Sequence, residues 1–197
     1  MINRTDPKFL FIHIAKAGGT SVTKAIAQHL NVNRETLRNS SNKFINGANI
    51  PSILKDEIDD YFIFSFVRSP WARVVSYFHY LQQVRHPPFN LSKNIEFLDW
   101  IRQEGFKYAK NGALTSASSQ LSDDSSIYQH IDFVGKIENI NSDWQYVCEK
   151  LDVDIELGHK KRSEHAHYTS YYDTETKNII SNHYERDIKL FDYSFGD

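Results

Sequence analysis

Residues 9–21 read FLFIHIAKAGGTS, and this stretch decides the fold class. Its first six residues are apolar apart from His13, as is typical of a central parallel strand that is covered on both faces. Beyond Gly18 and Gly19, apolar residues recur at helical spacing, and Thr20 or Ser21 is expected to cap the helix. The stretch therefore predicts a strand, a tight loop and a helix, in that order.

Two further segments repeat this pattern. Residues 61–67 (YFIFSFV) predict a second buried strand, and the following RSPWARVVSYFHYL predicts a helix with Ser69 as its N-cap and Pro70 at its first position. Residues 133–137 predict a third strand, followed by a helix that begins near Asn141. Buried strands separated by helices indicate an α/β fold with a central parallel sheet flanked by helices.

The remaining segments carry weaker signals. Residues 95–101 and 174–184 have the apolar spacing of helices, and residues 52–58 are consistent with a short helix. Polar composition predicts loops over residues 31–48 and 116–126, and a basic loop contains the run HKKRS. No internal repeat divides the chain, so we expect a single domain over residues 1–197.

Composition excludes several classes of function. The 197-residue chain has a net charge of −2, and its basic residues are dispersed, so no nucleic-acid partner is expected. One cysteine, Cys148, excludes an internal disulfide and fits a reducing compartment, which leads us to expect a cytoplasmic protein. No apolar run reaches the length of a membrane span, and the nine histidines lack zinc-ligand spacing, so neither a membrane span nor a metal site is expected.

The first loop has the composition of an anion site. A Gly-Gly turn after a buried strand directs backbone N–H groups toward one spot, and the following helix adds its positive end. In a Walker A loop the lysine follows the glycines, whereas here Lys16 comes two residues before Gly18. A loop for a magnesium nucleoside triphosphate is therefore disfavoured, while an ordinary strand-to-helix turn remains an alternative.

A second cationic group follows the second strand. Arg68 stands at its end, and Ser76 lies about two helical turns further along, so the guanidinium and the hydroxyl are suited to one anion. Many magnesium-dependent enzymes carry an aspartate for the metal at this strand end. The cation here favours a ligand whose anionic groups meet protein donors directly. Arg73 is suited either to the ligand or to bracing the loop through a carboxylate.

Together these residues resemble a known family. HIAKAGGTS and FVRSPWARVVSYF are similar to the two motifs of sulfotransferases that use 3′-phosphoadenosine 5′-phosphosulfate (PAPS), especially the short forms of the carbohydrate (family 2) branch. The second motif of that branch runs R-x-P-x-x-R-x-x-S-x-[YF]. The segment DFVGKIENI and the C-terminal block ending in FDY are also similar, so the resemblance covers most of the chain. The five residues that match the second motif are Arg68, Pro70, Arg73, Ser76 and Phe78.

The resemblance implies a fold related to the P-loop kinases, with PAPS bound at the carboxyl ends of the strands, where ligands of open α/β sheets lie. It implies that the first loop holds the 5′-phosphosulfate, and that Arg68 and Ser76 hold the 3′-phosphate. A C-terminal basic segment is implied to contact the nucleotide phosphates. The loop residues are Lys16, Ala17, Gly18, Gly19, Thr20 and Ser21, and the C-terminal ones are Lys160, Arg162 and Ser163.

The reaction implied is in-line sulfuryl transfer, in which negative charge builds on the departing phosphate oxygen. Lys16 is expected to stabilise that charge without a metal ion. Related enzymes usually place a catalytic histidine shortly before the second strand, but Asn46 and Ala48 occupy that neighbourhood here. Glu35 is therefore predicted as the base, with His29 as the nearest upstream histidine. Transfer assisted by the substrate or with poor activation of the hydroxyl is a further alternative.

The acceptor is expected to be a hydroxyl of a glycan or of another small molecule. Residues 31–48, 82–93 and 111–126 are expected to shape its binding site, because loops at strand ends carry specificity. Two other functions stay open from the sequence, a P-loop-type small-molecule kinase and a nucleotide-binding domain without catalysis. The sequence does not determine an oligomeric state.

Overall fold

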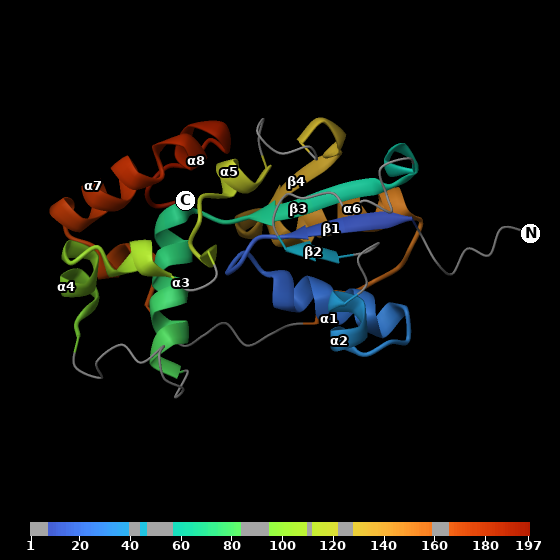
Figure 1. Cartoon of the computed structure of the whole chain (residues 1–197), viewed down its shortest axis with the longest axis horizontal. Helices are drawn as coiled ribbons and strands as arrows, with labels where there is room; N and C mark the ends of the chain where they lie inside the picture. The colour runs from blue at the N-terminus through green and yellow to red at the C-terminus, as the bar shows by residue number, and fades with distance from the viewer. Residues whose placement is uncertain are drawn as a thin grey trace, which may run out of the picture. The chain divides into compact units, whose positions relative to one another are not determined.

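A computed structural model of the chain describes residues 8–39, 44–46, 57–83, 95–109, 112–121, 128–158 and 166–197 (Figure 1). The chain divides into two compact units, one formed by Met1–Val67 with Ser119–Arg162 and the other by Arg68–Ser118 with Ser163–Asp197. The single domain stays a prediction.

The first unit is built on a four-stranded, fully parallel sheet with the strand order β2-β1-β3-β4. Ile12 pairs with Ser65 of β3, whose Oγ donates to the Ile12 carbonyl at 2.8 Å. Val67 pairs with Lys136 at the carboxyl end of β4. The strands are β1 (Phe9–His13), β2 (Phe44–Asn46), β3 (Phe62–Val67) and β4 (Phe133–Lys136).

Two helices bury their apolar sides in one core with the sheet. Alternate residues of β1 and β3 contribute phenylalanine side chains, as the two-residue period of a strand requires. Stacked rings of Phe11 and Phe64, with centroids 5.2 Å apart, join the two strands. Helix α1 (Gly19–His29) adds Val22 and Ile26, and helix α6 (Ile140–Leu151) adds Trp144 among others. The aromatic runs of the sequence are therefore core, as residues 9–21 and 61–67 predict.

The second unit consists of helices around an aromatic core. Phe78 of α3 contacts the rings of Phe97 and Trp100, each at a centroid distance of 5.2 Å, and Phe97 meets Tyr172 at 5.0 Å. Helix α7 begins with a capping box in which Asp173 and Thr176 bind each other's backbone N–H groups. The helices are α3 (Pro70–Gln83), α4 (Phe97–Arg102), α7 (Thr174–His183) and α8 (Glu185–Leu190).

Several element predictions are confirmed with small shifts of boundary. The strand expected over 61–67 begins at Phe62, and the one expected over 133–137 ends at Lys136. Helix α3 begins at Pro70, as its proline predicts. The helix expected over 174–184 ends at His183, and a further helix that was not predicted, α8, follows it. The short helix expected over 52–58 lies mostly outside the described residues.

Two predicted loops contain regular structure, so these predictions were wrong in part. Residues 31–48 include α2 (Arg34–Arg38), capped by the Asn33 side chain at 2.8 Å from the Thr36 N–H, and the edge strand β2. Residues 116–126 include α5 (Ala117–Leu121). These elements have three to five residues, which is too short for the apolar spacing to reveal.

Candidate functional site

The loop between β1 and α1 has a left-handed backbone at two positions. A turn closes between the Ala17 N–H and the Ile14 carbonyl at 3.2 Å. Lys16 has φ 67°, and Gly18 has φ 73°. Glycine adopts this conformation freely, whereas a lysine is held there at a cost of about 1–2 kcal/mol. Such local strain is a common feature of functional loops.

Both glycines allow close contacts that any side chain would block. A Cβ on Gly18 would come 2.3 Å from Cδ1 of Ile137, and one on Gly19 would come 2.0 Å from Cδ2 of His13. Distances this short are forbidden, so the loop must carry glycine at both positions or the neighbours must move. The 3₁₀ turn holding Ile137 and the last residue of β1 therefore enclose the Gly-Gly turn from two sides.

Gly18 is the N-cap of α1, so the prediction of Thr20 or Ser21 as the cap was wrong. The physical reason is the left-handed conformation at Gly18, which turns the chain directly into the helix at Gly19. Gly18 has no side chain with which to cap this end, and no acidic residue lies in the first turn. The first N–H groups of a helix lack partners within the helix, so this end suits an anion from outside.

The other predicted loop residues lie in this same turn. Thr20 is exposed and Ser21 half-exposed at the start of α1, where the Ser21 N–H donates to the Gly18 carbonyl at 2.9 Å. Lys16 is half-exposed, whereas the Ala17 side chain is buried, so Ala17 is available to a ligand only through its backbone. The structure thus brings all six predicted loop residues together over residues 16–21.

The residues of the second motif belong to the second unit. β3 ends at the same edge of the sheet as β1, because the two strands are parallel, and Arg68 is the next residue after Val67. Arg68 and Ser76 are both half-buried, while Val75 and Tyr77 beside Ser76 are buried. Ser76 therefore keeps part of its side chain exposed between two buried neighbours on α3.

Arg73 holds a backbone carbonyl, whereas the bracing role expected from the sequence was through a carboxylate. Its side chain is buried, and its Nη2 donates to the carbonyl of Ala113 at 3.1 Å. Burial lowers the pKa of Arg73, while the nearby Tyr184 and Asp187 oppose that shift. A buried guanidinium stays charged in proteins and therefore needs such partners.

The helix that carries Glu35, α2, does not bring this side chain close to the loop. Glu35 is exposed in the first turn of α2, which follows the carboxyl-terminal end of α1. Figure 1 shows α2 beside that end of α1. An 11-residue helix is about 16 Å long, so α1 separates Glu35 from Lys16 by roughly that length. The role of Glu35 as a base stays a prediction.

His29 ends α1 and is exposed at the same far end. Sequence reasoning overlooked His13, which is half-buried at the end of β1 and lies against Gly19. It also overlooked Lys136, the last residue of β4, whose backbone is in register with Val67. A usable signal exists for both, because polar residues at the carboxyl ends of buried parallel strands lie at the ligand edge.

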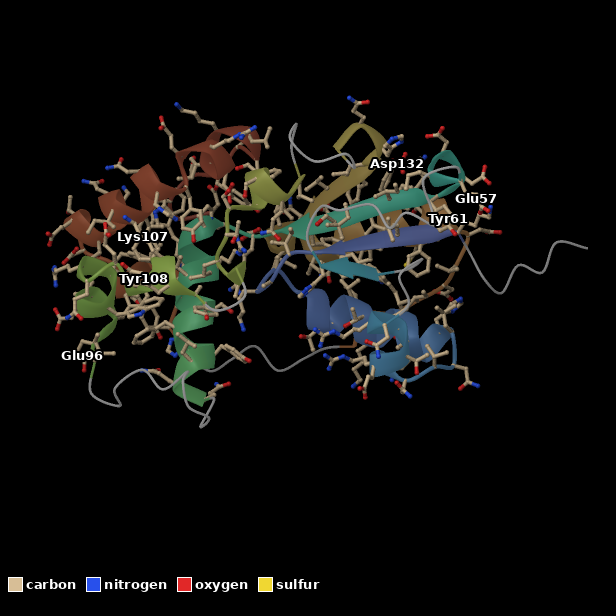
Figure 2. The ribbon with its side chains drawn as sticks, viewed as in Figure 1. Glu57, Tyr61, Glu96, Lys107, Tyr108 and Asp132 are labelled. Atoms are coloured by element: carbon tan, nitrogen blue, oxygen red, sulfur yellow. The ribbon has the colours of Figure 1, made fainter. Side chains whose placement is uncertain are left out.

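Acidic residues gather at the opposite, amino-terminal edge of the sheet. Figure 2 shows Glu57 and Asp132 there, beside Tyr61. Asp132 accepts the Ile63 N–H at 2.7 Å, and Lys8 pairs with Asp60 at 2.8 Å. These carboxylates bind groups near the start of β3, at the edge of the sheet opposite the loop.

Lys160, Arg162 and Ser163 lie outside the described residues, as does Ala48. Within the described ranges, no group of three or more His, Cys, Asp or Glu side chains is arranged to hold a metal ion. Across those same ranges, the helices are too short or too polar to cross a membrane.

Comparison with known proteins gives a match over almost the whole chain. The model of the sulfotransferase family matches residues 1–194. The chain is also similar to an uncharacterized protein of Archaeoglobus fulgidus, with 31% identity over 104 residues that make up 52% of this chain and 78% of that protein. The family match includes both motifs and every site residue discussed above. The chain therefore belongs to the sulfotransferase family.

Proposed function

We propose that this enzyme transfers the sulfuryl group of PAPS to a hydroxyl of a glycan or another small molecule. Membership in the sulfotransferase family supports sulfuryl transfer in general. The observation that supports a phosphosulfate donor is the start of α1, which has a left-handed glycine cap, no side-chain cap and no acidic residue in its first turn. An anion there meets backbone donors and the positive end of the helix.

The proposed roles follow the family motifs. The 5′-phosphosulfate contacts the N–H groups of Gly18, Gly19 and Thr20 and the hydroxyls of Thr20 and Ser21, because the N–H groups of Ala17 and Ser21 already donate within the loop. Arg68 and Ser76 bind the 3′-phosphate, the arginine as a fork and the serine as a neutral donor. The basic segment with Lys160, Arg162 and Ser163 contacts the nucleotide phosphates. We propose a P-loop-kinase-like arrangement, since β1, which leads into the loop, lies between two parallel strands.

In the proposed reaction, the acceptor oxygen attacks sulfur in line with the bond to the bridging phosphate oxygen. The new S–O bond forms as the old one breaks, and adenosine 3′,5′-bisphosphate leaves. The ammonium of Lys16 stabilises the negative charge that develops on the bridging oxygen, an effect worth about 3 kcal/mol for one preorganised donor. The left-handed backbone at Lys16 supports this role, because it fixes where the side chain leaves the loop.

The proton of the acceptor hydroxyl must pass to a base. Glu35 is the carboxylate proposed from the sequence, and it lies beyond the far end of α1. His13 is a second candidate because its ring contacts Gly19 at the first turn of α1. Imidazole is also the side chain best suited to accept a proton near neutral pH.

A thermal-shift experiment tests the proposed donor. Adenosine 3′,5′-bisphosphate without metal should stabilise the protein by about 2.7 kcal/mol at a hundred times its dissociation constant. Stronger stabilisation by ATP with magnesium would favour the kinase alternative instead. Binding of the bisphosphate without sulfuryl transfer to a panel of sugar and small-molecule hydroxyls would indicate a nucleotide-binding domain without catalysis.

A further inference from the structure

The second unit buries a charged network that the proposed reaction does not use. Arg73 of α3 and Asp187 of α8 are each 2% exposed, and Tyr184 between α7 and α8 is 1% exposed. We infer that Arg73, Tyr184 and Asp187 are positioning residues that fix α3, and with it Arg68 and Ser76, for binding the 3′-phosphate of the donor. This inference rests on the proposed function.

All three side chains bind the backbone of one short segment, residues 113–118. Arg73 Nη2 donates to the Ala113 carbonyl at 3.1 Å, and the Tyr184 hydroxyl donates to the Leu114 carbonyl at 2.7 Å. The Asp187 carboxylate accepts the N–H groups of Ala117 and Ser118 at 2.7 and 2.8 Å. These bonds are buried or partly buried, and each joins positions at least 40 residues apart.

Residues 113–118 are thus held by hydrogen bonds to α3 and α8, and they connect these two helices. Asp187 satisfies two N–H groups in the first turn of α5 that the helix itself leaves without partners. Arg73 reaches the same segment from α3, so α3 is tied to the segment and the segment to α8. A rotation of α3 about its axis would break the bond from Arg73 to Ala113 and leave a buried charge without that acceptor.

This connection bears directly on the proposed anion ligands. Ser76 is three residues after Arg73, so the two lie on neighbouring faces of α3 and turn together. Arg68 comes two residues before Pro70, the first residue of α3, and the Tyr172 hydroxyl donates to the carbonyl of the next residue, Trp71, at 3.0 Å. The position of the Ser76 hydroxyl is therefore determined by how firmly Arg73 is held.

Stability alone does not explain why charged groups occupy these places. Well-packed apolar side chains often replace a buried charged network with no loss of stability. Directional bonds to four backbone groups instead specify one orientation of α3. An orientation requirement is expected where a helix must present a serine and an arginine to one phosphate.

The test compares two ligands that differ in the 3′-phosphate. Dissociation constants for adenosine 3′,5′-bisphosphate and adenosine 5′-monophosphate are measured by calorimetry for the wild type, Asp187→Asn and Arg73→Lys. Both variants conserve size, and their folding is checked by circular dichroism. Glu185→Gln is the matched control, because Glu185 is exposed on the same helix and loses the same charge.

The wild type should prefer the bisphosphate, and each variant should lose about tenfold of that preference while its affinity for the monophosphate stays within about twofold. Glu185→Gln should retain the full preference. A folded variant that keeps the wild-type ratio overturns the inference, because loss of overall stability would not change the ratio selectively. A wild type without any preference for the bisphosphate contradicts the proposed function instead.

Hydrogen exchange on the wild type tests the same network without a variant. The amides of Ala117 and Ser118 should exchange slowly in spite of their place at the start of a five-residue helix, because Asp187 binds them in a buried site. Exchange as fast as that of exposed helix ends would show that the network does not hold the segment, and would overturn the inference.

Discussion

The imidazole of His13 lies against the α-carbon of Gly19, so that a Cβ on Gly19 would come 2.0 Å from the ring. The last residue of the first strand thereby touches the first residue of the first helix. Their contact closes the loop that is proposed to bind the phosphosulfate. The missing side chain at position 19 is what makes this closure possible.

Gly19→Ala should therefore destabilise the protein by about 1–3 kcal/mol, as overpacking of a close contact does. It should also weaken binding of adenosine 3′,5′-bisphosphate, since the ring or the loop must shift. Urea unfolding and calorimetry measure the two effects. Gly158→Ala is the control, because a Cβ at that exposed glycine meets nothing within 4 Å. Equal stability of the two variants would contradict the contact.

Two substitutions of Lys16 separate the effect of its ammonium group on catalysis from the effect of its left-handed backbone on stability. Lys16→Ala and Lys16→Gly both remove the ammonium, so both should lower kcat by a factor on the order of 10²–10³, while bisphosphate binding survives in part. Relief of left-handed strain, about 1–2 kcal/mol, exceeds the entropic cost of glycine, about 0.4–1 kcal/mol, so Lys16→Gly should be the more stable of the two. An unchanged kcat in either variant would remove Lys16 from the mechanism.

The pH dependence of kcat/KM distinguishes the two candidate bases. Because α1 separates Glu35 from the loop, we expect an ionisation near neutral pH to persist in Glu35→Gln. The same ionisation should disappear in His13→Gln, which keeps a polar side chain of similar length. Loss of the ionisation in Glu35→Gln alone would restore Glu35 as the base.

Tyr184 makes the stability of the protein sensitive to high pH. Burial, the largest cause, raises the pKa of Tyr184 well above its ordinary value of 10.0. Above about pH 10 the unfolded chain loses this phenolic proton and the folded protein keeps it, so the folded state binds more protons and the unfolding free energy falls as pH rises. Below about pH 10 both states keep the phenolic proton, so the contribution of Tyr184 to the unfolding free energy is fully present.

Tyr184→Phe should therefore flatten the decline of the unfolding free energy between pH 9.5 and 11.5, a range of about two units around the ordinary tyrosine pKa. At neutral pH it should cost about 1 kcal/mol, because the bond to the Leu114 carbonyl is lost. Tyr108→Phe is the control, since Tyr108 is 83% exposed. Parallel pH profiles for the wild type and Tyr184→Phe would disprove the prediction.

The elements that could be predicted share a local origin. The runs that form β1 and β3 are apolar along their length, and Pro70 marks the start of α3 because its ring suits a first helical position. The parallel order of these strands places residues 16–21 and the residue before Arg68 at one edge of the sheet. The loop residues and the second motif are therefore recognisable in the sequence, and their role in binding stays a prediction.

Features that depend on contacts between residues far apart in the chain could not be predicted from local sequence patterns. Gly18, the cap of α1, lies against Ile137, which is more than a hundred residues later in the chain. Helix α5 has only five residues, and Asp187 holds its first turn from a position about 70 residues away.

The sequence by itself determined the alternation of strands and helices and the residues of the two motifs that are proposed to bind anions, because apolar spacing and turn residues act between near neighbours. Only the tertiary structure decided that His13 closes the loop, that Glu35 lies beyond the far end of α1, and that Arg73 is a brace. These outcomes depend on side chains that meet only when the chain has folded, and no local pattern encodes them.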